Sequence, residues 1–160
     1  MLEILRKKRD EEGFTLIELM VVVLIIAILI AIAIPTFLGA RSRAQDRAAQ
    51  SNIRNAFTAE KVYYTDNQVY TDTTANLSTI EPSLTFVQAS SATSASVVGQ
   101  VHVLKATTNG TDDSVYVSAR SASGTCFYLK DVSSGTGAGT KYARDTACGA
   151  ATGELYTTAW

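Results

Sequence analysis

Hydrophobic residues follow three patterns along the chain. From Leu19 to Ala40 the sequence has no charged residue and is almost wholly apolar. Between residues 41 and 64, apolar residues recur mostly at three- and four-residue steps, which predicts a helix with one apolar face. From about residue 84, short stretches alternate between apolar and polar residues, which is typical of half-buried strands. These patterns predict an apolar helix, its amphipathic continuation and a sheet.

The apolar segment is long enough to cross a membrane. As a helix, residues 14–40 would extend roughly 40 Å, and a bilayer core is about 30 Å thick. The segment is too long for a conventional signal peptide, and the basic residues before it (Arg6, Lys7, Lys8 and Arg9) favour a cytoplasmic N-terminus. A plain membrane anchor leaves Glu18 unexplained, because a carboxylate at membrane depth costs about 2.5–3.5 kcal/mol.

The amphipathic part predicts that one nearly continuous helix runs from about Phe14 to Tyr64. Pro35 predicts a kink or a locally melted stretch, and Gly39 adds a second soft point. The apolar face, interrupted by Glu60, is expected to lie on the sheet. The polar face carries several arginines, which are read as a solvated face or as ion pairs between subunits, with nucleic-acid binding as the alternative (Arg41, Arg43, Arg47 and Arg54).

The remaining residues predict a helix-covered sheet. Residues 67–83 are expected to form a loop, with tyrosines that pack it onto the helix or form a stacking surface (Tyr63, Tyr64 and Tyr70). Strands are predicted at residues 84–89, 97–104, 114–119 and 125–130, with hairpin turns at Asn109-Gly110 and Ser123-Gly124. An antiparallel sheet of about three to five strands with the helix on one face satisfies the burial rule for two-layer domains.

The two cysteines, Cys126 and Cys148, lie near the C-terminus. An even number in an exported domain favours a disulfide over two free thiols, and it would contribute about 3 kcal/mol. The spacing does not fit a C-x-x-C redox motif, and with His102 as the single histidine a zinc site is not expected. Residues 132–147 are rich in Ser, Gly and Thr, so we expect an irregular segment that the disulfide ties to the preceding strand.

Few features suggest catalysis. The formal net charge of −1 provides no global basic field for nucleic acid. Residues 135–141 superficially resemble a phosphate loop, but the order is Gly-Thr-Lys and no helix pattern follows. His102 lies in an alternating strand without a motif-level nucleophile or metal partner. We therefore predict no catalytic residue, cofactor or metal, and a protein that is not an enzyme.

The segment Gly13-Phe14-Thr15-Leu16-Ile17-Glu18-Leu19-Met20-Val21-Val22 closely resembles the N-terminal signature of type IV prepilins. Pro35 falls where that family has its helix-bending proline. The resemblance is strong over residues 13–43 and weaker over residues 59–67. It implies that a prepilin peptidase cleaves between Gly13 and Phe14 and methylates the new Phe14 amine. It also implies that Glu18 pairs with the amine of a neighbouring Phe14 and helps to register subunits in a filament.

This interpretation divides the chain into four parts: a leader (1–13), a transmembrane and assembly helix (14–40), an amphipathic helical half (41–66) and a globular head (67–160). The expected fold class is α+β, with the apolar half of the helix protruding and a C-terminal loop closed by the disulfide. The leader departs from the usual pattern, because Asp10, Glu11 and Glu12 make residues 2–12 formally neutral. Glu18 is expected to gain its partner only when cleavage creates the Phe14 amine.

The predicted function is a structural subunit of a bacterial type IV pilus. The resemblance implies a precursor in the cytoplasmic membrane that an ATPase-driven assembly machinery extracts into a surface homopolymer. Adhesion, twitching motility and DNA uptake remain alternative roles, and any surface or DNA ligand is unidentified. A pseudopilin of a type II secretion or competence system is the first rival, against which the cysteine pair modestly favours a pilin. A membrane-anchored surface binding module is the remote rival.

Overall fold

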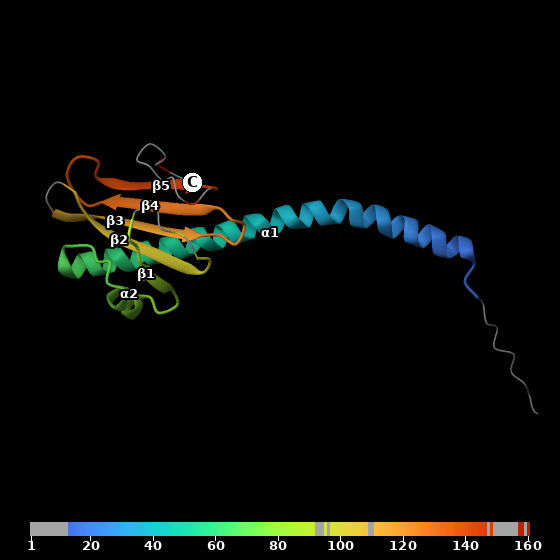
Figure 1. The fold of residues 1–160 in the computed structure, drawn as a ribbon, viewed down its shortest axis with the longest axis horizontal. Coiled ribbons are helices and arrows are strands. Elements are labelled where there is room, and N and C mark those ends of the chain that lie inside the picture. The colour runs from blue at the N-terminus through green and yellow to red at the C-terminus, as the bar shows by residue number, and fades with distance from the viewer. Residues whose placement is uncertain are drawn as a thin grey trace, which may run out of the picture. The chain divides into compact units, whose positions relative to one another are not determined.

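The computed structural model describes residues 13–91, 95, 97–108, 111–146, 148, 157–158 and 160, and these residues are meant wherever the structure is discussed. The chain divides into two compact units, residues 1–40 and 41–160. Helix α1 (Leu16–Asn67) spans 52 residues and contributes to both units (Figure 1). The prediction of one long helix is confirmed.

In the first unit, α1 exposes its large apolar side chains. Their exposed fractions run from 47% at Ile26 to 87% for Phe14, just before the helix. The helix is long and apolar enough to cross a membrane by length and composition. It remains α-helical through Pro35 and Gly39, so no melted stretch occurs there, and the kink stays a prediction. Next to the proline, the Thr36 hydroxyl donates to the carbonyl oxygens of Ile32 and Ala33 at 3.1 and 2.9 Å.

In the second unit, α1 lies along one face of a five-stranded sheet with the order β1-β2-β3-β4-β5 (Figure 1). The strands are β1 (Thr85–Gln88), β2 (Gln100–Thr108), β3 (Thr111–Arg120), β4 (Cys126–Val132) and β5 (Gly139–Asp145). Small and β-branched side chains of α1 meet alternate residues of the strands in one core, which includes Ala49, Ile53, Ala56, Ala59, Val101, Val103, Val115, Val117, Phe127 and Leu129. The expected α+β fold is confirmed.

Two elements were missed by the sequence prediction. The expected loop at 67–83 contains α2 (Thr74–Ile80), a helix that places Leu77 fully in the core. The expected irregular segment at 132–147 contains β5, which pairs with β4 from Cys126↔Asp145 to Val132↔Gly139. Its Ser/Gly/Thr-rich composition concealed a strand, because the neighbouring strand supplies the hydrogen bonds that intrinsic propensity does not promise.

Two details of the sheet also differ from prediction. β1 runs parallel to β2, whereas the other neighbouring strands are antiparallel. β2 begins at Gln100 rather than Val97, directly after Gly99, whose φ of +85° suits a turn. The predicted turn at Ser123-Gly124 is confirmed, with the Gly124 N–H donating to the Ser121 carbonyl at 3.0 Å. The other predicted turn, Asn109-Gly110, lies outside the described residues.

The predicted disulfide is confirmed between Cys126 and Cys148. Cys126 opens β4 and is fully buried, and Cys148 follows the end of β5. The bond therefore closes a loop that contains the whole β4–β5 hairpin, rather than the irregular segment expected from the sequence.

Candidate assembly segment

Thr15 and Glu18 form a reciprocal set of hydrogen bonds at the start of α1. The Thr15 N–H and the Thr15 hydroxyl donate to Glu18 Oε2 at 2.9 and 2.7 Å. The Glu18 N–H donates to Thr15 Oγ1 at 3.2 Å. This is a capping box, in which a threonine before the helix and a glutamate three residues later satisfy free backbone N–H groups.

The capping box corrects the expectation that Glu18 lacks a partner before cleavage. The Gly13–Phe14 peptide bond is intact in this chain, and Glu18 already accepts two hydrogen bonds. The sequence carried the signal, because a threonine followed three residues later by a glutamate, before an apolar run, is the pattern of a capping box. Thr15 is thus a functional candidate that the sequence reasoning missed.

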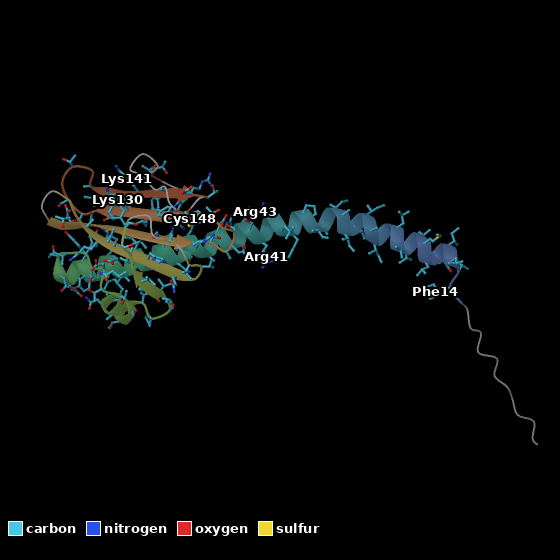
Figure 2. The ribbon with its side chains drawn as sticks, in the orientation of Figure 1. Phe14, Arg41, Arg43, Lys130, Lys141 and Cys148 are labelled. Carbon is cyan, nitrogen blue, oxygen red and sulfur yellow. A yellow bond between two sulfur atoms is a disulfide. The ribbon has the colours of Figure 1, made fainter. Side chains whose placement is uncertain are left out.

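Gly13 and Phe14 are accessible, and the fold itself does not explain the glycine. A Cβ built onto Gly13 would meet no other atom within 4 Å, and the Phe14 side chain is 87% exposed (Figure 2). A requirement for glycine here would therefore come from a molecule outside the chain, as a peptidase would impose. Cleavage after Gly13, methylation of Phe14 and an assembly role for Glu18 remain predictions.

In the second unit, a polar cluster joins α1 to the sheet and to the segment after α1. The Lys61 ammonium donates to Asp131 Oδ2 and to Tyr70 Oη, both at 2.6 Å. The Tyr70 hydroxyl donates to Asp131, and the Thr140 hydroxyl donates to Asp131 Oδ1 at 2.5 Å. The Tyr64 and Tyr70 rings lie 4.7 Å apart, so these tyrosines pack the segment onto the helix as predicted.

The electrostatics of this cluster fix the ionisation of Asp131. Burial alone would raise the pKa of its carboxyl, but the hydrogen bonds from Lys61, Thr140 and Tyr70 outweigh burial and lower it. Burial and the hydrogen bond to Asp131 raise the pKa of Tyr70. The stable state is therefore an ionised Asp131 with a neutral Tyr70, which is a structural arrangement that ties three elements together.

Glu60 is the polar residue on the apolar face of α1, and it is fully buried. Its Oε2 accepts a hydrogen bond of 3.2 Å from the Thr71 N–H, whereas Oε1 has no hydrogen-bond partner among the described residues. Burial raises the pKa of Glu60 to about 8, against the lowering effect of the Thr71 bond, and the charge of Asp72 raises it further. Glu60 is therefore predominantly protonated at neutral pH.

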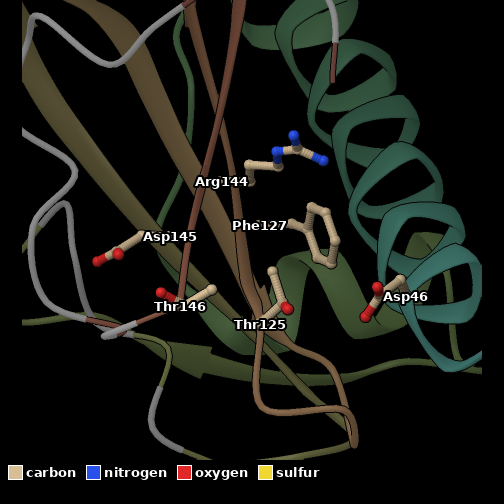
Figure 3. Close-up of a pocket in the computed structure, with 6 residues that line it drawn as sticks. All are labelled: Asp46, Thr125, Phe127, Arg144, Asp145 and Thr146. Carbon is tan, nitrogen blue, oxygen red and sulfur yellow. The ribbon is translucent and has the colours of Figure 1, made fainter. Parts of the chain in front are cut away.

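Other polar candidates do not converge on one site. His102 is buried on β2, on the face opposite α1, and burial lowers its pKa. An open groove of about 330 Å³ lies between α1 and the ends of β4 and β5 (Figure 3). It is lined by Asp46, Thr125, Phe127, Arg144, Asp145 and Thr146. Among the described residues, no group of three or more His, Cys, Asp or Glu side chains is arranged to hold a metal ion.

Comparisons with known proteins agree with the N-terminal geometry. Residues 8–34 match the family model of the prokaryotic N-terminal methylation motif. The chain is 42% identical over 60 residues to the type IV major pilin protein PilA of Myxococcus xanthus, covering 38% of this chain and 27% of the relative. It is 39% identical over 69 residues to the type IV wide pilus major component PilA4 of Thermus thermophilus, covering 43% and 53%.

A secretion protein shows similar likeness. The chain is 37% identical over 73 residues to the type II secretion system core protein G of Vibrio cholerae, covering 46% of this chain and 50% of the relative. The chain therefore spans between about a quarter and a half of the length of these three relatives. The likeness to all three is partial, so it supports the shared N-terminal features more strongly than any role of a whole relative.

Proposed function

Because the chain belongs to the type IV pilin and pseudopilin superfamily, we propose that it is a structural subunit of a type IV pilus. The precursor is held in the cytoplasmic membrane by the apolar half of α1. A prepilin peptidase removes residues 1–13 and methylates the Phe14 amine. An ATPase-driven machinery then assembles the processed chains into a surface homopolymer.

The observation that carries this proposal is a carboxylate with a ready local partner at the start of an exposed apolar helix. Thr15 satisfies Glu18 Oε2 in the uncleaved chain. A carboxylate has two oxygens and about four acceptor positions, so Glu18 keeps capacity for a further donor. The processed Phe14 amine of a neighbouring subunit is such a donor, and its charge would strengthen the bond.

Two measurements test the proposal. Mass spectrometry of the exported chain should find an N-terminus at methylated Phe14. Electron microscopy should show filaments for the wild type and none, or very few, for Glu18→Ala, with membrane insertion preserved. Glu81→Ala is a control that removes a carboxylate from the head. An uncut N-terminus or normal filaments from the Glu18 variant would refute the proposal.

A pseudopilin is the second candidate, and the likeness to a type II secretion system core protein G favours it. The pilus is preferred because the disulfide closes the β4–β5 hairpin, and such a covalent closure suits a subunit exposed outside the cell. Long surface fibres whose main component is this chain would support the pilus. A processed chain that stays in the envelope and is required for protein secretion would support the pseudopilus.

A further inference from the structure

Three arginines lie close together on α1, directly after the apolar run ends at Ala40. They are Arg41, Arg43 and Arg47, named here the arginine cluster, and all three are exposed. Figure 2 shows the side chains of Arg41 and Arg43 standing away from the helix. No hydrogen bond, ion pair or ring contact joins any of the three to a described residue.

The nearest acidic residue in the sequence is not their partner. Asp46 accepts a hydrogen bond from the Ser123 hydroxyl, and Figure 3 shows its side chain at the groove beside the sheet. Arg43 and Arg47 stand four residues apart, a spacing at which like charges repel on a helix. The cluster is therefore an uncompensated positive surface, and an anion outside the described head would stabilise it.

Arg54 shows what an arginine committed to the head looks like. It lies further along α1, and its guanidinium carbon is 5.1 Å from the centre of the Trp160 ring. That contact is a cation–π interaction, which uses the positive charge within the folded unit. The arginine cluster has no comparable use, and this difference separates it from an ordinary arginine of the helix–sheet interface.

We propose that the arginine cluster binds the phosphate headgroups of anionic phospholipids while the subunit waits in the membrane. This inference rests on the membrane-held stage of the proposed function. Residues 19–40 form a helical run of roughly 30 Å, which matches the hydrocarbon core, so the residues that follow enter the headgroup layer. The rise from Arg41 to Arg47 is about 9 Å, and arginine side chains can adjust to reach one layer of phosphates.

The chemistry of the cluster suits phosphate better than a solvated face does. A guanidinium binds phosphate oxygens through two parallel hydrogen bonds, and it loses less hydration than an ammonium. Processing would also remove the basic residues of the leader, which leaves the arginine cluster as the basic group adjoining the apolar helix. Each arginine near an anionic surface is expected to favour binding by roughly fivefold.

The test measures which lipids surround the subunit. A fluorescent donor is attached to the full-length Ser51→Cys chain, whose native cysteines are protected by their disulfide. The chain is reconstituted in phosphatidylcholine vesicles with a trace of acceptor-labelled phosphatidylglycerol or acceptor-labelled phosphatidylcholine. Energy transfer should report a several-fold enrichment of phosphatidylglycerol at low salt. Because salt screens exposed charges, the enrichment should fall towards unity at about 0.5 M salt.

Matched variants identify the residues responsible. Substitution of Arg41, Arg43 and Arg47 by glutamine should abolish the enrichment, and substitution by lysine should keep most of it. Lys130→Gln, Lys141→Gln and Arg144→Gln together remove the same charge from β4 and β5, and this control should behave as the wild type. The control residues Lys130 and Lys141 are shown in Figure 2.

Several results would overturn the inference. Equal transfer to both acceptors in the wild type would do so, as would unchanged enrichment in the glutamine variant. If the glutamine variant loses cross-linking between subunits and the wild type has no lipid preference, the arginines act between copies of the chain instead. Loss of filaments through Glu18→Ala with lipid enrichment intact would concern assembly alone. The lipid inference and the proposed function can therefore fail separately.

Discussion

The two halves of α1 belong to one helix but meet opposite surroundings. Ile28, in the first half, is 54% exposed, whereas Ile53, in the second half, is fully buried against the sheet. The first half is apolar on every side, and the second half is apolar on one face only. This difference teaches that the period of the pattern, rather than hydrophobicity, tells whether a helix finds its partner within its own chain.

The two glutamates of these halves extend the comparison. Glu18 stands on an exposed segment and is held by Thr15 through short local bonds. Glu60 stands in a closed core and has one hydrogen bond of 3.2 Å and one oxygen without a partner. The exposed half therefore leaves its carboxylate available for assembly, whereas the buried half holds its carboxylate at an energetic cost.

The comparison would break most clearly under matched truncations of two isoleucines. Ile53→Ala should lower the free energy of unfolding of the head by about 3–4 kcal/mol, because it leaves a cavity in a close-packed core. Ile28→Ala should change it by less than about 0.5 kcal/mol, because its side chain is not part of that core. Chemical unfolding of the full chain in detergent, followed by near-ultraviolet circular dichroism, measures both. Equal losses would contradict the separation of the two halves.

The next effect concerns the ionic bond between the second half of α1 and the sheet. Asp131→Asn should destabilise the head by about 2–3 kcal/mol, since Lys61 and Tyr70 lose a buried ionic partner. The loss stays below that for a fully buried pair because the Lys61 side chain is 44% exposed and can return to water. Asp66→Asn, on the exposed end of the helix, is the control and should have little effect in the same unfolding measurement.

Much of this architecture was predictable because local pattern and final packing agree. The unbroken run at 19–40, the apolar face of the amphipathic part and the alternation around Val115 and Val117 all report the surroundings that the structure provides. The disulfide followed from the number of cysteines and the expected export. At these positions, the same residues that set local propensity also meet the core.

The failures occurred where distant residues decide the outcome. β5 has weak strand propensity, and its pairing with β4 is fixed by long-range hydrogen bonds rather than by its own sequence. The partners of Lys61 could not be read from the chain, because Asp131 lies 70 residues away. The Thr15–Glu18 pair is different: its signal was local and was overlooked because attention rested on the charge of Glu18 alone.

A pH titration would sharpen the contrast between the two glutamates. The pKa of Glu60 is about 8 in the folded chain, against an ordinary value of 4.5, so the folded state binds this proton more tightly than the unfolded state does. The contribution of Glu60 to stability therefore falls as the pH rises from about 4.5 to about 8.

Glu60→Gln should remove this loss and stabilise the head by about 2 kcal/mol at pH 8, with little change at pH 5. The measurement is the free energy of unfolding at both pH values, with Asp66→Asn as an exposed control that keeps the wild-type pH dependence. A Gln variant that follows the wild type at both pH values would show that Glu60 is ionised in the folded state.

The smallest effect is expected at the start of the exposed half. Thr15→Ala removes the hydroxyl that bonds to Glu18 and should weaken the first turn of α1 by about 1 kcal/mol. Amide hydrogen exchange of residues 15–18 in detergent should become roughly fivefold faster, while exchange around Ile53 stays unchanged. Thr15→Ser keeps the hydroxyl and should retain most of the protection. Because the capping box is local, a change that spread to the head would contradict the independence of the two halves.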